Sequence, residues 1–182
     1  MPYDAPDLSR LSLLQIAELV SARKIPPVGQ WHPDHSGDSE MRIAADGRWF
    51  HQGGEITRPA MVRAFSSLLR READGGYWLV TPQEKLVIKV EDAPFIAVEM
   101  RCEGLGEARS IAFRLNSDDL VIAGAAHPIE LRPLPCLHVR DGLWAKFARP
   151  VYYEFAQMAL EESHEPPGLW SEGMFFPIGD AV

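Results

Sequence analysis

The sequence predicts an α+β protein built around an internally duplicated hairpin–helix unit. The tetrapeptides Asp46-Gly47-Arg48-Trp49 and Asp141-Gly142-Leu143-Trp144 differ only at their third position, and each follows a strand-like run. Each also precedes an Arg-Pro pair, Arg58-Pro59 or Arg149-Pro150, and then a helix-like segment. Proline is well suited to the first turn of a helix, where no hydrogen bond is lost. Because these features recur in the same order, we expect the two hairpins and their helices to superpose.

Length and composition fit one domain or two small ones. The chain has 182 residues, of which 46% are hydrophobic, and a formal net charge of −8. This charge disfavours general nucleic-acid binding, which depends on clustered cations. We find no apolar run long enough to span a bilayer and no cleavable signal peptide at the N-terminus. Cys102 and Cys136 match no CxxC pattern and are expected to be buried free thiols, so we expect a cytoplasmic protein without a membrane segment.

Residues 1–76 are expected to form a small N-terminal α+β part. Ser12 with Gln15 fits a capping box ahead of an apolar stripe, so a helix begins there and ends before Pro26-Pro27. A loop follows, and then a hairpin whose tight turn is formed by Asp46-Gly47. A second helix, capped by Thr57, is expected to continue to the next Asp-Gly-Gly sequence.

Residues 77–182 are expected to form a β-rich C-terminal part. Seven short runs rich in branched or aromatic residues span 77–80, 85–91, 95–102, 110–115, 120–123, 129–131 and 137–146. Pro150 then opens a final helix, which Pro166-Pro167 terminates. Seven strands followed by a helix suggest a small curled sheet or barrel closed by that helix, as in the pleckstrin-homology superfold. This likeness is one of fold and not of function.

Several segments resemble the signature of a bacterial family known only as domain of unknown function 1285. They are residues 46–59, 77–82, 84–85 and 90–95, and the resemblance extends over nearly the whole chain, from Trp31 to Phe176. The resemblance implies a duplicated α+β architecture with a pleckstrin-homology-like C-terminal part. It also implies a ligand site at the interface of the two parts and a role in signalling, with no established activity.

The densest cluster of polar and aromatic residues contains Arg48, Trp49, His51 and Arg58 around a Gln-Gly-Gly turn. Glycines expose backbone N–H groups, and arginines offer forked donors that match phosphate or carboxylate. Arg48 and His51 have no counterpart in the second copy, which favours a binding role for both. Trp49 does have a counterpart, which favours a core role over a stacking surface.

Thr81, Glu84 and Lys85 lie where the helical part joins the β part. The Glu–Lys pair either contributes to a ligand site or forms a weak surface ion pair. Together with the arginine cluster, these residues predict a small anionic, nucleotide-like ligand at the interface of the two parts, with no metal or cofactor. On this hypothesis Arg48→Leu leaves stability unchanged and abolishes binding.

A non-enzymatic ligand-binding or sensory module is the first hypothesis for function, because no Gly-x-Ser-x-Gly elbow, Walker loop or Gly-x-Gly-x-x-Gly motif is present. A second is an enzyme acting on a small acidic substrate, with His51 as general acid or base and Arg48 or Arg58 as the electrostatic clamp. A third is a protein–protein adaptor that docks through residues 168–170 and 174–176. Those residues alternatively form an apolar strap packed on the body of the chain.

Overall fold

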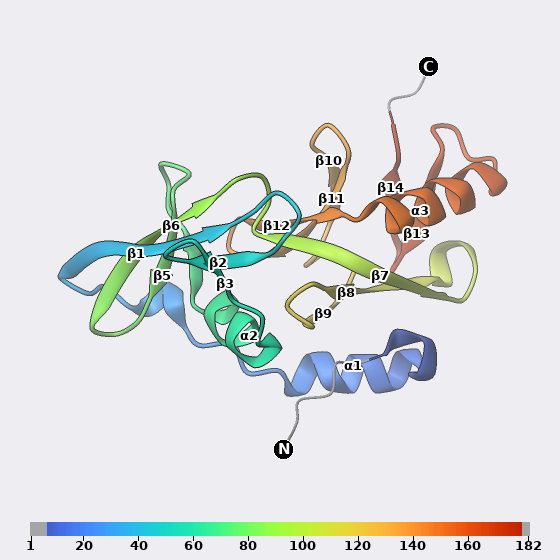
Figure 1. Cartoon of the computed structure of the whole chain (residues 1–182). Coiled ribbons are helices and arrows are strands. Elements are labelled where there is room, and N and C mark those ends of the chain that lie inside the picture. The colour runs from blue at the N-terminus through green and yellow to red at the C-terminus, as the bar shows by residue number, and fades with distance from the viewer. Residues whose placement is uncertain (1–6, 180–182) are drawn as a thin grey trace.

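A computed structural model describes residues 7–179, which form two six-stranded sheets side by side, with three α-helices (Figure 1). Residues 1–6 and 180–182 lie outside this range. The first of these segments belongs to the N-terminus, where we expected no signal peptide. The first sheet contains β1 (His35–Ile43), β2 (Trp49–His51), β3 (Gly54–Glu55), β4 (Leu69–Arg71), β5 (Tyr77–Val80) and β6 (Glu84–Val90). The second contains β7 (Phe95–Glu103), β8 (Ser110–Leu115), β9 (Leu120–Ile122), β10 (Ile129–Leu131), β11 (Pro135–Arg140) and β12 (Leu143–Phe147). The other elements are α1 (Leu13–Ala22), α2 (Pro59–Ser67), α3 (Arg149–Glu161) and a separate hairpin of β13 (Gly168–Ser171) and β14 (Met174–Pro177).

The two sheets share one topology, and this is the duplication within the chain. The strand order is β3-β2-β1-β6-β5-β4 in the first sheet and β9-β8-β7-β12-β11-β10 in the second. In each sheet, two antiparallel meanders of three strands are joined by a parallel pair between the first strand and the last. These parallel pairs are β1 with β6 and β7 with β12. The expected duplication is therefore present at the level of whole sheets.

The two Asp-Gly hairpins, however, occupy different places in this shared topology. Asp46-Gly47 connects the first two strands of its sheet, whereas Asp141-Gly142 connects the last two. Trp49 is only 2% exposed, while Trp144 is half-buried, with the guanidinium of Arg132 over its ring. The expected superposition of the two hairpin–helix units is therefore wrong. A match at three of four residues identifies a type of turn but not its position within a sheet.

The boundary between the sheets lies between β6 and β7 rather than after Gly76. The runs that form β5 and β6 pair with β4 and β1, so they belong to the first sheet. The last predicted run, residues 137–146, is a hairpin whose two strands are β11 and β12. The second sheet therefore has six strands where seven were expected. The final helix, α3, packs against its core through Val151, Phe155 and Ala159.

All three α-helices begin close to where the sequence predicts, but α2 ends earlier than expected. The hydroxyl of Ser12 and the side chain of Gln15 form the predicted capping box of α1. The residue before α2 is Arg58 rather than Thr57, and no side chain caps this helix. α2 ends at Ser67, and the chain continues almost directly into β4. None of the helices within residues 7–179 is long and apolar enough to cross a bilayer.

A single apolar cluster runs through both sheets and holds them together as one body. It includes Ile43 and Leu69 from the first sheet and Phe113 and Leu137 from the second. α1 lies along the second sheet (Figure 1), where Ile16 packs in a smaller apolar cluster.

A buried carboxylate adds polar contacts to the junction between the two parts. The side chain of Asp119 is 8% exposed, and it accepts a hydrogen bond from Nε of Arg23 at 2.6 Å. Arg63 of α2 approaches the same carboxylate at 3.5 Å, and the hydroxyl of Ser117 donates to it at 2.9 Å. Asp119 therefore connects the segment after α1, helix α2 and the second sheet.

Candidate functional site

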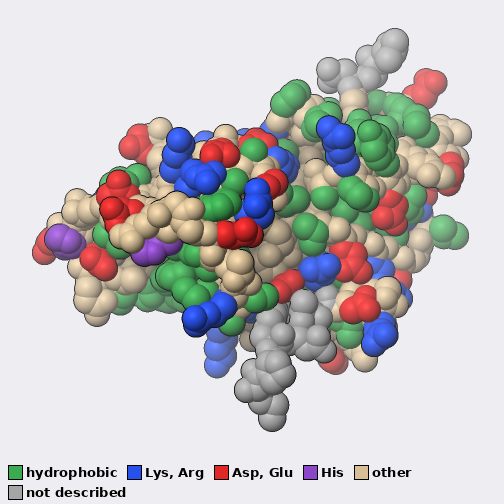
Figure 2. Space-filling model, in the orientation of Figure 1, with side chains coloured by type: hydrophobic (Ala, Val, Ile, Leu, Met, Phe, Trp, Pro, Cys, Tyr) green, Lys and Arg blue, Asp and Glu red, His purple; other side chains and the backbone are tan. Residues whose placement is uncertain are grey.

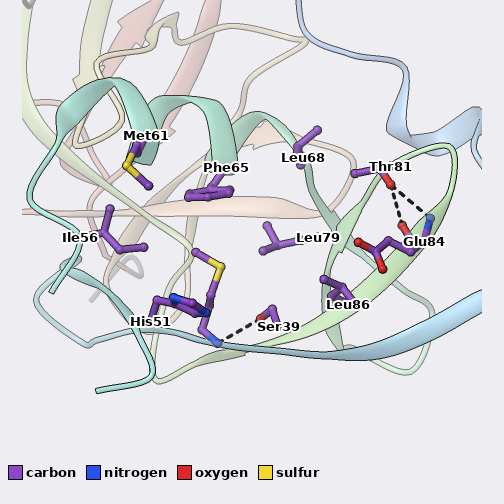
Figure 3. Close-up of a pocket in the computed structure, with 11 residues that line it drawn as sticks. Ser39, His51, Ile56, Met61, Phe65, Leu68, Leu79, Thr81, Glu84 and Leu86 are labelled. Carbon is purple, nitrogen blue, oxygen red and sulfur yellow. Dashed lines mark hydrogen bonds between the residues drawn. The ribbon is translucent and has the colours of Figure 1, made fainter. Parts of the chain in front are cut away.

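His51, Thr81 and Glu84, three of the predicted site residues, line one cavity in the first part of the chain (Figure 3). This α2 cavity has a volume of about 340 Å³ and lies between α2 and the first sheet. Its apolar wall consists of Met41, Ile56, Met61, Phe65, Leu68, Leu79 and Leu86, and Ser39 completes the polar rim. The lining residues come from both sides of the boundary that we expected after Gly76, but α2 and the first sheet supply the helix and the strands around the cavity, so it lies within the first part as the sheets divide the chain.

Strand alternation explains which of the predicted residues face the α2 cavity. Successive side chains of a strand point to opposite faces, so residues two positions apart share one face. Trp49 and His51 of β2 both face α2, and Trp49 stacks on Phe65 of that helix with ring centroids 6.4 Å apart. Trp49 thus has the core role that the sequence favours.

Lys85 faces the opposite side of β6 from Glu84. Its ammonium group lies 4.5 Å from the centre of the Trp78 ring and 3.0 Å from the carboxylate of Glu72. Hydrogen bonds from Arg70 and Lys85 hold the pKa of Glu72 below its usual value. Lys85 is therefore a structural ion-pair residue and does not line the α2 cavity.

Four polar side chains lie at the rim of the α2 cavity, and two of them, those of His51 and Glu84, have unused hydrogen-bonding capacity. The hydroxyl of Ser39 donates to the carbonyl of Val87 at 2.7 Å, and the hydroxyl of Thr81 donates to the carbonyl of Glu84 at 3.2 Å. Within residues 7–179, neither the ring of His51 nor the carboxylate of Glu84 makes a hydrogen bond. The ring of His35 lies 3.9 Å from the carboxylate of Glu84.

Arg58 lines an adjoining recess of about 360 Å³, which shares His51, Ile56 and Met61 with the α2 cavity. Arg48 lines neither the cavity nor this recess. It lies on the exposed hairpin, where it pairs with Asp46 at 2.7 Å and with Glu55 at 3.5 Å.

We expect Arg48→Leu to leave the midpoint of urea unfolding unchanged, because exposed ion pairs contribute little to stability. Ligand binding in the α2 cavity or the adjoining recess is also expected to be unchanged, since Arg48 lines neither. Urea unfolding curves and ligand titrations of this variant check both statements. A large fall in the midpoint would mean that the pairs with Asp46 and Glu55 hold the hairpin in place.

A second cavity, of about 360 Å³, lies where the two parts meet and is called the interface cleft below. Its lining residues are Arg71, Tyr77, Asp92, Ala93, Pro94, Arg132, Pro133, Leu134, Cys136, Trp144 and Lys146. These residues come from both sheets and from the segment that connects them. The sequence reasoning missed all of them as site residues, because they form no motif along the chain.

The interface cleft combines aromatic rings with an excess of cations. The guanidinium carbon of Arg132 lies 3.8 Å from the centre of the Trp144 ring, and that of Arg71 lies 5.5 Å from the centre of the Tyr77 ring. Arg71 also donates to a backbone carbonyl of the second part at 3.3 Å, but it pairs with no carboxylate among the described residues. Lys146 pairs with the only carboxylate of the lining, that of Asp92, at 2.6 Å. Arg132 pairs at 3.0 Å with Glu130, which lies outside the lining, so three cations against two carboxylates leave the cleft net positive.

Neither cysteine is set up as a nucleophile. Burial raises the pKa of the Cys136 thiol in the interface cleft, and it raises the pKa of the half-buried Cys102 thiol to about 11. Both thiols are therefore protonated at neutral pH, and the thiolate is the reactive form. In the described range, no three histidine, cysteine, aspartate or glutamate side chains are grouped so that they could hold a metal ion.

Comparisons with known proteins identify relatives over both sheets. A family model described as "Domain of unknown function (DUF1285), N-terminal domain" matches residues 26–93, and "Protein of unknown function (DUF1285), C-terminal domain" matches residues 94–178. The two matches meet in the segment between β6 and β7, where the sheets also divide. No protein with a curated description matches the chain.

Two crystal structures resemble the structure of this chain. A DUF1285 family protein from Silicibacter pomeroyi DSS-3 is 41% identical, with a TM-score of 0.78 over 93% of this chain and 95% of that chain. A DUF1285 family protein from Shewanella baltica OS155 is 26% identical, with a TM-score of 0.50 over 64% of this chain and 90% of that chain.

Proposed function

We propose that this chain, which belongs to the DUF1285 family, is a non-enzymatic sensory module that binds a planar anionic ligand in the interface cleft. The observation that carries the proposal is the position of Arg71. Its guanidinium lies beside an aromatic ring and lacks a carboxylate partner among the described residues, whereas the other two cations of the cleft are paired.

The lining of the interface cleft supports a ligand with an aromatic ring and an anionic group. In this proposal a planar ring stacks on Trp144 or Tyr77 by taking the place of the guanidinium that lies over that ring, and stacking of a base on an aromatic side chain contributes about 1–3 kcal/mol. A hydrogen bond from Arg71 to phosphate or carboxylate is charge-assisted and contributes roughly 1.5–3 kcal/mol. A volume of about 360 Å³ suits a small molecule. A compound the size of a nucleoside monophosphate combines these features.

A sensory role follows from the location of the interface cleft. A ligand there contacts residues from both sheets, so its binding energy favours one arrangement of the two parts. A protein partner that distinguishes the bound arrangement from the free one would complete a signalling pathway. A cytoplasmic location belongs to the same proposal, as does the pleckstrin-homology-like description of the second sheet with α3.

The other two hypotheses have less support. An acid–base enzyme needs an oriented histidine, but the ring of His51 is exposed and no described residue hydrogen-bonds to it. An adaptor needs an exposed docking segment, but Leu169 and Phe176 of the β13–β14 hairpin are buried in the core of the same chain. The hairpin therefore fits the description of an apolar strap.

Isothermal titration with three probes tests the proposed function. Adenosine 5′-monophosphate carries both the ring and the anion, whereas adenosine and inorganic phosphate each carry one of them. We expect the monophosphate to bind at least tenfold more tightly than either fragment. We expect Arg71→Gln to weaken its binding at least tenfold, which corresponds to about 1.4 kcal/mol or more.

Arg10→Gln is the matched control, because it removes the same charge from a side chain that is 85% exposed and distant from the cleft lining. This variant should bind the monophosphate like the unaltered protein. Equal affinity for all three probes, or an Arg71→Gln variant with unaltered affinity, would contradict the proposal.

A further inference from the structure

The α2 cavity and the interface cleft differ in chemistry. The interface cleft is net positive, whereas the only charged side chain that lines the α2 cavity is the carboxylate of Glu84. The rest of the α2 cavity is mainly apolar. We propose that the α2 cavity is a second binding site, which takes a small apolar amine with its ammonium group at Glu84.

The wall of the α2 cavity determines the size and polarity of the hydrophobic portion of this ligand. Met61 and Phe65 come from the helix, and Met41, Leu79 and Leu86 come from the facing strands (Figure 3). The volume of about 340 Å³ corresponds to that of roughly eleven liquid water molecules. An aromatic ring or short alkyl chain leaves water on entering this space, which is the favourable term in apolar binding.

The rim of the α2 cavity determines the head group. The hydroxyls of Ser39 and Thr81 already donate to backbone carbonyls. The Glu84 carboxylate accepts no hydrogen bond within the described range, and the imidazole that lies nearest to it, that of His35, is 71% exposed and 3.9 Å away. An ammonium group supplies both the charge and the donors that this carboxylate lacks. An anionic head group is repelled at the same position.

The cations near the α2 cavity do not neutralise Glu84. Lys85 points to the other face of β6, where it pairs with Glu72 at 3.0 Å. Arg58 lines the adjoining recess rather than the cavity. In Figure 3, Glu84 and Thr81 lie at one end of the cavity and His51 lies at the other. The carboxylate therefore controls one end, and the imidazole is free to accept or donate a hydrogen bond at the other.

The α2 cavity lies near the surface of the first part. Figure 2 shows hydrophobic side chains gathered below the β2–β3 strands, with a histidine at their edge. Charged side chains of both signs are interspersed over the strands above them. The lining of the α2 cavity likewise combines an apolar wall with a few polar groups, which is typical of ligand sites.

Isothermal titration of the 182-residue chain with three compounds of one shape tests the inference. 3-Phenylpropylamine, 3-phenylpropanol and 3-phenylpropanoate share a body and differ in the head group. We expect the amine to bind best and the carboxylate worst, with at least a tenfold difference between them. In Glu84→Gln the amine is expected to lose its advantage over the alcohol. Glu18→Gln makes the same change of charge on the exposed face of α1 and should retain it.

The outcomes separate this inference from the proposed function. Arg71→Gln, which removes a cation from the interface cleft, should leave amine binding unchanged. The inference is overturned if the carboxylate binds as tightly as the amine, if Glu84→Gln keeps the preference for the amine, or if none of the three compounds binds. None of these results bears on the binding of adenosine 5′-monophosphate at the interface cleft.

Discussion

Trp49→Ala is expected to lower the free energy of unfolding by about 3–5 kcal/mol, the usual cost of deleting a large buried aromatic side chain. Trp49 is 2% exposed and stacks on Phe65, so its removal leaves a void between the first sheet and α2. Chemical denaturation followed by far-UV circular dichroism measures the loss.

Trp144→Ala is the matched control, because Trp144 occupies the equivalent position in the second Asp-Gly hairpin. Its ring is half-buried beside Arg132 rather than enclosed in the core. We expect a loss of about 1 kcal/mol, the typical value for a substitution that leaves no large cavity. Equal losses in the two variants would mean that the two tryptophans have equivalent roles after all.

Asp119→Asn is expected to destabilise the chain by about 3 kcal/mol, because breaking a buried ion pair leaves its partner uncompensated. Asp119 pairs with Arg23 at 2.6 Å and lies 3.5 Å from Arg63 of α2. The amide keeps the shape of the side chain, removes its charge and replaces one of the two acceptor oxygens with an NH2 donor. Thermal unfolding measures the effect, and Asp34→Asn on the exposed loop before β1 controls for the change in net charge. A variant as stable as this control would show that the charge of Asp119 contributes little to the junction.

The sequence predicted individual elements more accurately than their pairing. Ser12 and Gln15 mark the start of α1 because a capping box is local to the helix that it begins. Strand-like runs carry no comparable mark of the sheet that they join. The parallel contact of β1 with β6 pairs residues that are far apart in the sequence, such as His35 and Glu84. This pairing determines that β5 and β6 belong to the first part.

The difference between local sequence signals and long-range pairing also explains which of the predicted site residues line a cavity. His51 and Glu84 were identified from a glycine-rich turn and a strand start, and both line the α2 cavity. Arg48 and Lys85 lie beside them in sequence, but an ion pair and strand alternation direct these side chains elsewhere. The interface cleft could not be predicted in this way. Its cations and rings come from separate strands and loops that only the arrangement of the two sheets brings together.

The central claim is that the interface cleft binds a planar anion, and the indole N–H resonances of the five tryptophans test it most directly. In a ¹⁵N-labelled sample titrated with adenosine 5′-monophosphate, we expect the Trp144 resonance to shift and saturate. The resonance of the buried Trp49 should stay in place. In Arg71→Gln the shift of Trp144 should require at least tenfold more ligand. A titration that leaves Trp144 unmoved at millimolar monophosphate, or that moves only Trp49, would contradict binding at the interface cleft.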